Sequence, residues 1–338
     1  MVTRQDKEEN MEPVQQILDL VAALSEEQME ELQLTLNHSL PKPKKLTYVE
    51  DVKKSKISEI RICPHCGSNL IKGHGNYHGR KRFKCGMCYR TFTELTHTPI
   101  SNTKYPEKWD EFIQCCTEGL SLRKIASRLN INVATAFSWR HKLMAAYVSD
   151  QTLTGIAEAD ETFFLYSEKG SKTVSKVRKP RKRGGKGKTA GIGNDQVPVV
   201  VGKDREGNLI VGVAGKGRVS AKDIEQVLED HIDSKATLCT DAHPSFKSFA
   251  KANSLKYIQL NISKGKRVVR KKYHIQTVNS AHSNIKKWMM RFNGVSTKYL
   301  QNYMNWFCLL EETKGKKEQP REFAQKVIHP SIDEIGGI

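Results

Sequence analysis

Acidic side chains in the middle of the chain are the first candidates for chemistry. Residues 155–166 (GIAEADETFFLY) place Asp160 in a small, apolar segment that leads into aromatic β-formers, which predicts a buried strand. On such a strand Glu158 and Asp160 share one face with Thr162, whereas Glu161 points the other way. A buried carboxylate costs free energy unless a positive group neutralises it, and a metal ion is one such group. Asp160 is therefore a candidate metal ligand.

Four cysteines form a second candidate site. Cys63 and Cys66, followed by Cys85 and Cys88, make two C-x2-C pairs separated by eighteen residues. Four thiolates at this spacing predict a tetrahedral, structural zinc site. The glycine-containing, basic segment between the pairs suits a β-hairpin. The alternatives are a redox pair or two disulfides, which a reducing compartment disfavours.

Charge and hydropathy narrow the class of partner. The 338 residues carry a formal net charge of +19 with a pI near 9.5, which favours a polyanion: nucleic acid first, an anionic membrane surface second. No apolar run reaches the length of a spanning helix, and residues 1–10 are polar, so neither a membrane anchor nor a secretory signal is expected. These features predict a cytoplasmic protein, associated with the nucleoid if the partner is DNA.

The segment before the cysteines has a helical pattern. Residues 13–36 predict two amphipathic helices, the second beginning with a capping box formed by Ser25 and Gln28. Residues 40–45 (LPKPKK) predict a linker. A short helical hairpin that packs or self-associates is the simplest interpretation.

A second helical segment follows the cysteines. Within residues 119–143, a helix capped by Ser121, a turn at 130–132 and a second helix make the helix–turn–helix pattern. A plain three-helix bundle is the alternative. The basic charge and the adjoining ribbon favour DNA contact, with Arg140 and Lys142 of the second helix as candidate contacts.

Further along the chain, the order of elements predicts a mixed α/β domain. The strand with Asp160 precedes a basic loop at 169–188, a strand hairpin, a helix, a strand ending in Asp241, a helix, a strand and a long helix from about residue 276. This order resembles the ribonuclease-H-like core of DDE transposases and integrases. The resemblance implies that acids on the central strand, the neighbouring strand and a later helix hold two Mg²⁺ or Mn²⁺ ions.

The third ligand of such a site departs from the usual carboxylate. No Asp or Glu lies between Asp241 and Glu311. Asn279 stands in that segment instead, and recurs with Ser283 and Lys286 on one helical face. An asparagine carbonyl oxygen can ligate Mg²⁺, although it brings no charge.

Several motifs make the resemblance more specific. Asp160-Glu-Thr, Thr240-Asp241-Ala-His, His274 followed by Thr277-Val-Asn279, and the segment 295–304 resemble the ISXO-type insertion-sequence transposases. That family pairs a zinc ribbon with a DDE-type domain and tolerates Asn at the third catalytic position. The resemblance covers roughly residues 60–310.

The resemblance implies roles for individual residues. Asp160, Asp241 and Asn279 would hold the catalytic Mg²⁺ or Mn²⁺, and Lys286 would contact DNA at the active site. His274 matches a motif position without an assigned role. His282 stands where many relatives carry an aromatic residue, a change expected to alter packing only. Apart from the resemblance, backbone contacts to DNA are expected from the basic loop at 169–188, from the cluster at 264–272 and from Lys287. The candidate residues are Arg181, Lys182, Arg183, Lys271, Lys272 and Lys287.

These observations predict a multidomain DNA transposase. The expected domains are a helical extension and linker (1–45), a zinc ribbon (58–98), a helix–turn–helix region (104–150), a ribonuclease-H-like domain with a mixed sheet (153–312) and a C-terminal tail (313–338). Its partners would be its own terminal inverted repeats, target DNA and a second copy of the chain, without a membrane. The alternatives are a non-catalytic DNA-binding regulator derived from a transposase, and a nuclease of the same fold.

Overall fold

The chain divides into two compact units, residues 1–46 and 47–338. The structure is a computed structural model that describes residues 11–39, 47–77, 79–171, 192–261, 265 and 267–328. The first unit contains the helices α2 (Met11–Ala22) and α3 (Glu26–Ser39). Gln28 Oε1 accepts from Ser25 N at 3.0 Å and Ser25 Oγ accepts from Gln28 N at 3.3 Å, which confirms the predicted capping box. The expected linker at 40–45 lies outside the described residues.

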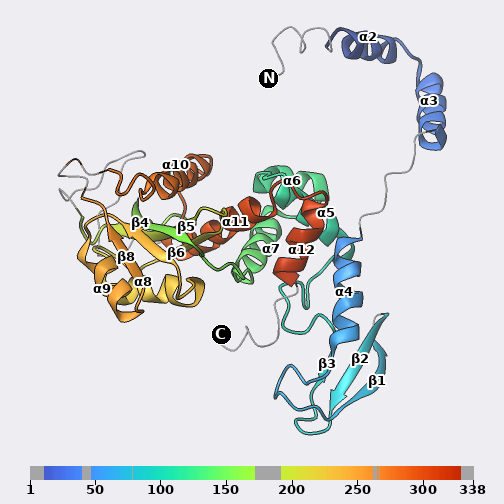
Figure 1. Ribbon diagram of the computed structural model, residues 1–338. Helices are drawn as coiled ribbons and strands as arrows, with labels where there is room; N and C mark the ends of the chain where they lie inside the picture. The colour runs from blue at the N-terminus through green and yellow to red at the C-terminus, as the bar shows by residue number, and fades with distance from the viewer. Residues whose placement is uncertain are drawn as a thin grey trace. The chain divides into compact units, whose positions relative to one another are not determined.

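The second unit begins with a helix and a small sheet. α4 (Tyr48–Glu59) precedes the antiparallel strands β1 (Ile71–Tyr77), β2 (Arg80–Cys85) and β3 (Thr91–Phe92), in the order β1-β2-β3 (Figure 1). Phe83 pairs with Phe92 across β2 and β3, and their rings stack at 5.5 Å. The predicted hairpin between the cysteine pairs is therefore confirmed.

Three helices follow the small sheet. After the short helix η1 (Pro106–Lys108), they are α5 (Trp109–Thr117), α6 (Leu122–Leu129) and α7 (Val133–Ala145). Ser121 Oγ accepts from Lys124 N at 3.4 Å, so the predicted cap begins α6. Asn130 ends α6 in the left-handed region, with φ of 49°, and Asn132 Oδ1 caps α7 by accepting from Ala134 N at 2.8 Å. These local signals fix the turn between the two helices.

A five-stranded mixed sheet forms the centre of the second half. Its strands are β4 (Ile156–Leu165), β5 (Gln196–Asp204), β6 (Leu209–Val213), β7 (Thr237–Thr240) and β8 (Lys256–Gln259), in the order β6-β5-β4-β7-β8. β4, β5 and β6 are antiparallel, whereas β4, β7 and β8 are parallel. The predicted mixed sheet, with the Asp160 strand at its centre, is confirmed.

Helices cover both faces of this sheet (Figure 1). On one face, Ala157 and Ala159 pack with α8 (Ala221–Leu228) and α9 (Pro244–Ala252), and the short helix η2 (Glu229–His231) follows α8. The other face, with Val199 and Val201, packs against α10 (Gln276–Met290) and α11 (Leu300–Thr313), the latter preceded by η4 (Thr297–Tyr299).

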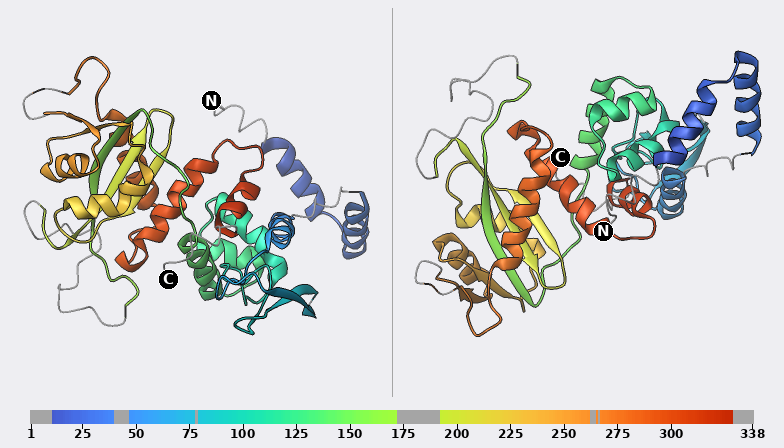
Figure 2. Two further views of the ribbon diagram at one scale, coloured as in Figure 1. Left: turned by 60° about the horizontal axis from the view of Figure 1, so that its bottom comes forward. Right: turned by 90° about the horizontal axis from the view of Figure 1, so that it is seen from above.

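One hydrophobic core joins the sheet to the helices before it. α11 lies between the sheet and α7 (Figure 2), and Trp306 Nε1 donates to Cys116 O of α5 at 3.2 Å. The core continues through α4, α5, α6 and α7, so the α5–α7 helices and the α/β segment are not separate hydrophobic units.

The C-terminal segment differs from the expected tail. Residues 319–328 form α12 (Gln319–Ile328), whose side chains Phe323 and Val327 are fully buried against this shared core. Their i, i+4 spacing gives the helix an apolar face, which is the reason it packs. Within the described residues, no helix combines the length and apolarity needed to cross a membrane.

Candidate active site

Asp160 and Asp241 lie side by side on neighbouring strands. β4 and β7 are parallel, with Glu158 opposite Cys239, so two residues further along both strands the register brings Asp160 level with Asp241. Neighbouring strands are about 4.8 Å apart, and side chains of the same parity share a face. Asp241 follows the end of β7, where its Oδ1 accepts from His243 N at 2.9 Å. The sequence-predicted pair is therefore brought together in the interior of the sheet, where β7 ends.

Burial and neighbouring negative charge make ionisation of Asp160 unfavourable unless a cation is bound. Burial, followed by the charges of Glu161 and Asp241, raises the pKa of Asp160 to about 7. Burial also raises the pKa of Glu161, and the Asp241 charge adds to this effect while His243 opposes it. Crowded, partly buried carboxylates of this kind suit a divalent ion bound through oxygen, as Mg²⁺ and Mn²⁺ prefer. The residues present fit such an ion.

The polar side of α10 faces Asp160. His282 Nδ1 lies 3.8 Å from Asp160 Oδ2, and the Lys286 charge acts to lower the pKa of Asp160. Asn279 stands on the same side of the helix, one turn before His282, and is exposed. Burial, then the charge of Lys286, lowers the pKa of His282 to about 4. This imidazole is therefore neutral at physiological pH.

His282 corrects one expectation from the sequence. The substitution for an aromatic residue was expected to alter packing only, but the ring contacts the candidate metal ligand Asp160. The sequence contains a signal for this contact. His282 is three residues after Asn279, and residues i and i+3 share a helix face. The sequence reasoning also left Glu161 and His243 without a role, although both act on the charge state of this site.

The four cysteines gather into one metal-binding geometry. The ligand atoms of Cys63, Cys66, Cys85 and Cys88 all lie within 4.8 Å of one another. Sγ of Cys63 and Cys88 are 3.7 Å apart, and Sγ of Cys66 and Cys85 are 3.6 Å apart. Zinc–sulfur bonds of about 2.3 Å give tetrahedral edges of about 3.8 Å, whereas a disulfide needs about 2.05 Å. The cluster therefore fits a zinc ion and contains no disulfide.

Backbone amides stabilise the thiolate of Cys85. Met87 N and Cys88 N donate to Cys85 Sγ at 3.3 and 3.5 Å. The Cys88 amide is the larger influence, and together with that of Met87 it lowers the pKa of Cys85 to about 6. Burial instead raises the pKa of Cys63 to about 11. A bound cation would reverse that cost, because metal ligation needs the thiolate.

The residues expected to contact DNA fall into three groups. Lys142, Lys271, Lys272, Lys286 and Lys287 are exposed. Arg181, Lys182 and Arg183 lie outside the described residues.

Arg140, the third case, is a correction. Its side chain is 2% exposed, its Nη2 donates to Leu120 O at 2.6 Å, and its guanidinium lies 4.3 Å from the Trp306 ring. The helix α7 carries it inward because α11 packs on that side. Arg140 therefore supports the core and does not offer its charge to a DNA backbone.

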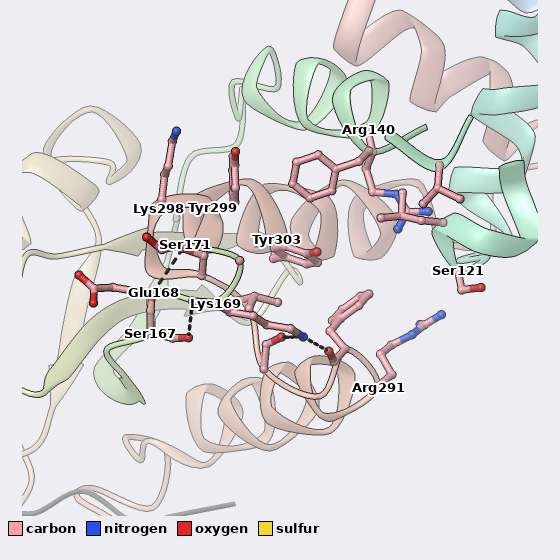
Figure 3. Close-up of a pocket in the computed structure, with 18 of the residues that line it drawn as sticks. Ser121, Arg140, Ser167, Glu168, Lys169, Ser171, Arg291, Lys298, Tyr299 and Tyr303 are labelled. Atoms are coloured by element: carbon pink, nitrogen blue, oxygen red, sulfur yellow. Dashed lines mark hydrogen bonds between the residues drawn. The ribbon is translucent and has the colours of Figure 1, made fainter. Parts of the chain in front are cut away.

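A cleft of about 1030 Å³ lies where the helices α6 and α7 meet the α/β segment (Figure 3). It is lined by residues of α6 and α7, by residues 166–171, which follow β4, and by the segment from the end of α10 into α11. Lys169 lines the cleft, and its Nζ donates to the carbonyls of Phe292 at 3.1 Å and Gly294 at 2.6 Å (Figure 3). Tyr166, which lines the cleft, is six residues beyond Asp160 and so about 20 Å along the strand. The cleft is therefore separate from the candidate active site.

Comparisons with known proteins agree with this architecture. Residues 152–308 match the model of the ISXO2-like transposase domain. The chain is 25% identical over 275 residues to an uncharacterized protein in the transposable element ISH50 of Halobacterium salinarum, covering 79% of this chain and 89% of that protein.

Two solved structures show weak similarity. One is a simian T-cell lymphotropic virus intasome in complex with PP2A regulatory subunit B56 gamma, with 13% identity, a TM-score of 0.27, and 55% of this chain and 65% of that chain covered. The other is the Mos1 mariner paired end complex with Mn, with 11% identity, a TM-score of 0.22, and 67% and 80% covered. The family match and the transposable-element relative carry the assignment: residues 152–308 belong to the ISXO2-like transposase domains, and the predicted relationship to ISXO-type insertion-sequence transposases is confirmed.

Proposed function

We propose that this chain is a DNA transposase that hydrolyses a phosphodiester at each end of its element and joins the freed 3′-hydroxyl to target DNA. The observation that carries the proposal is the pair Asp160 and Asp241, level on adjacent parallel strands and faced by the polar side of α10. The transposase domain assigned to residues 152–308 supports it.

Each residue of the site has a proposed task. Asp160, Asp241 and the carbonyl oxygen of Asn279 would hold Mg²⁺ or Mn²⁺. Divalent ions bound there supply the Lewis acidity that activates water or a 3′-hydroxyl and stabilises the leaving oxygen. His282, neutral at physiological pH, contacts Asp160 without adding charge. Lys286, exposed near this site, would hold a DNA phosphate.

DNA and a second copy of the chain are the proposed partners. The cysteine cluster, holding a structural zinc ion, and the helices α5–α7 would bind the terminal inverted repeats. The exposed side chains of Lys142, Lys271, Lys272 and Lys287 would contact the DNA backbone. Because transposition joins two element ends in one complex, we expect a dimer or larger assembly.

The second candidate function is a DNA-binding regulator that has lost catalysis. It is favoured by one observation: the segment between Asp241 and Glu311 contains no carboxylate, so Asn279 replaces a charged ligand. A regulator would need neither Asp160 nor Asp241 for its action.

A plasmid that carries the gene with its native flanks separates the two candidates. With purified protein and Mg²⁺ or Mn²⁺, the transposase proposal expects 3′ ends at two flanking inverted repeats. Asp241→Ala should remove these cuts and leave DNA binding in place. Tight binding at the flanks by the unaltered chain, without metal-dependent cutting, would instead establish the regulator. Cuts without joined products would identify a nuclease.

Two neighbouring cations on α7 test the proposed DNA contacts. Arg140→Ala should lower the free energy of unfolding by about 2–4 kcal/mol, because it removes a charge-assisted hydrogen bond and a cation–π contact. Lys142→Ala should change stability by less than about 0.5 kcal/mol and reduce the salt slope of DNA binding by about 1. Urea unfolding and fluorescence anisotropy at several salt concentrations measure both effects. If the two variants exchange these behaviours, the assigned orientation of α7 is wrong.

A further inference from the structure

A buried carboxylate ties the start of α10 to the central strand. Glu158 lies two residues before Asp160 on β4 and is fully buried. Its Oε2 accepts from Val278 N, in the first turn of α10, at 2.9 Å. Its Oε1 lies 2.6 Å from Arg205 Nη2 and 3.1 Å from His274 Nδ1. One side chain on β4 thus contacts the β5–β6 turn and the start of α10, both of which are distant from it in the sequence.

Arg205 and His274 complete this cluster. Arg205 stands in the turn between β5 and β6, where its Nη1 donates to Thr277 Oγ1 of α10 at 2.8 Å. Its Nη2 also lies 3.3 Å from His274 Nδ1. His274 Nδ1 accepts from Gln276 N, the first residue of α10, at 3.3 Å. His274, whose motif position had no role, therefore contacts the start of α10 as well as Arg205 and Glu158.

Burial of the Glu158 carboxylate makes the geometry of this cluster energetically important. A carboxylate without solvent access costs free energy unless it is paired and hydrogen-bonded. Glu158 meets both needs, since it is placed at the positive end of a helix and beside a guanidinium. Its Oε2 is hydrogen-bonded, its Oε1 is paired with the Arg205 charge, and the residue has no exposed surface, so it is not itself a ligand for an ion beside Asp160.

The consequence concerns the alignment of α10 with β4. Asn279 directly follows Val278, and His282 is one turn further on. The first turn of α10 is held directly by Glu158 Oε2 and, through Arg205, by the hydrogen bond to Thr277 Oγ1. Two attachments at one turn fix the position of the helix along the strand and its rotation. Glu158 and Asp160 are on the same strand face, about 7 Å apart. The contact that fixes the helix and the candidate metal ligand therefore share one rigid strand.

We propose that Glu158, with Arg205 and His274, is a positioning residue that sets Asn279 and His282 against Asp160. The carbonyl oxygen of Asn279 carries no charge and is attracted to an ion only weakly. Its position therefore depends on where α10 is held. This inference rests on the proposed function in so far as it concerns the ion, whereas the attachment of α10 to β4 can be measured without one.

Ferrous ion used in place of Mg²⁺ tests the arrangement in the full-length protein. With ascorbate and peroxide, Fe²⁺ bound at the site should cleave the backbone near Asp160, near Asp241 and in the first turns of α10. In Glu158→Gln, which keeps the volume and one acceptor oxygen, we expect the α10 cleavage to fall at least 5-fold relative to the other two. Arg205→Lys, which keeps the charge and loses the paired geometry, should give a smaller fall of the same kind.

Leu228→Ala is the matched control for lost stability. Leu228 is fully buried on the α8–α9 face of the sheet, away from α10, so its truncation should leave the ratio of the three cleavages unchanged. An unchanged ratio in both Glu158→Gln and Arg205→Lys would overturn the proposal, as would an equal fall in Leu228→Ala.

Hydrogen exchange separates this inference from the proposed metal site. In metal-free protein, the first-turn amides of α10 should exchange at least 10-fold faster in Glu158→Gln than in the unaltered chain, and not in Leu228→Ala. If Fe²⁺ cleaves the unaltered chain nowhere near Asp160 or Asp241, the metal site fails, and this exchange result alone decides the role of Glu158. Equal exchange rates of these amides in the unaltered chain, Glu158→Gln and Leu228→Ala would refute the positioning role of Glu158. If Glu158→Gln does not fold, the same comparison with Arg205→Lys decides.

Discussion

Asp160→Asn is expected to abolish metal-dependent DNA cleavage while making the metal-free protein more stable. Losing the central carboxylate should reduce the cleavage rate at least about 10³-fold, equivalent to about 4 kcal/mol of transition-state stabilisation. Stability should change in the opposite direction, because asparagine removes a charge that is crowded by Glu161 and Asp241. A variant that loses activity and gains stability cannot be inactive through misfolding.

The difference between the folded and unfolded pKa of Asp160 determines how this gain in stability depends on pH. The pKa of Asp160 is about 7 in the folded chain and about 3.9 in an unfolded chain. Between these values the folded chain binds more protons than the unfolded chain, so the stability of the metal-free protein falls as pH rises from about 4 to about 7. Asp160→Asn should lack this component and be more stable by about 2–4 kcal/mol at pH 8. Added Mg²⁺ should stabilise the unaltered chain and leave the variant unchanged.

Thermal unfolding at pH 5 and pH 8, with and without Mg²⁺, measures these effects beside the cleavage assay. Glu161→Gln is the matched control, because it removes a neighbouring carboxylate that points to the other face of β4. It should keep cleavage within about tenfold, since Glu161 is not a proposed ligand. Asp160→Asn with wild-type cleavage, or with lower metal-free stability at pH 8, would contradict the assignment of Asp160.

Removing zinc is expected to unfold the ribbon and leave the rest of the second unit folded. The ribbon has a small buried cluster of its own, formed by Cys63, Phe83, Cys85 and Phe92. Such a cluster cannot hold three short strands without the metal, and structural zinc sites contribute about 10–16 kcal/mol of apparent folding free energy. The helices α5–α7 belong to the large core shared with α11 and α12, so they should persist.

Cys63→Ser and zinc chelation should give the same result. Metal analysis should find one zinc per chain before either treatment and none after chelation, and hydrogen exchange should show loss of protection in the ribbon strands β1, β2 and β3 only. Cys115→Ala is the control: Cys115 is a fully buried thiol of α5, outside the cluster, so its replacement should keep the zinc. Protected ribbon amides in zinc-free protein would show that the cluster does not depend on the metal.

Features that depend on short-range chemistry could be predicted from the sequence. The cap at Ser121, the capping box at Ser25 and the two C-x2-C pairs each depend on neighbours within a few residues, and each has the predicted local geometry. The alternation along β4 likewise placed Asp160 and Glu161 on opposite faces, because a strand has a period of two. The family motifs then indicated the transposase domain that the family match confirms.

Which face of each helix meets a distant segment depends on tertiary packing and could not be predicted from the sequence. Arg140 is polar and stands on a predicted DNA-reading helix, but α11, more than 150 residues later in the chain, covers it. The periodicity of α7 could not show this, since a helix buried on two sides has no single apolar stripe.

The same limit applied to the surroundings of Asp160. Glu158, Arg205 and His274 come from a strand, a turn and the segment before a helix, and no local pattern links them. Their contact exists because β5 lies beside β4 and α10 crosses both. Side-chain spacing determines which elements form, whereas the packing of those elements decides which charges meet, because burial makes an unpaired charge costly only after the fold has closed around it.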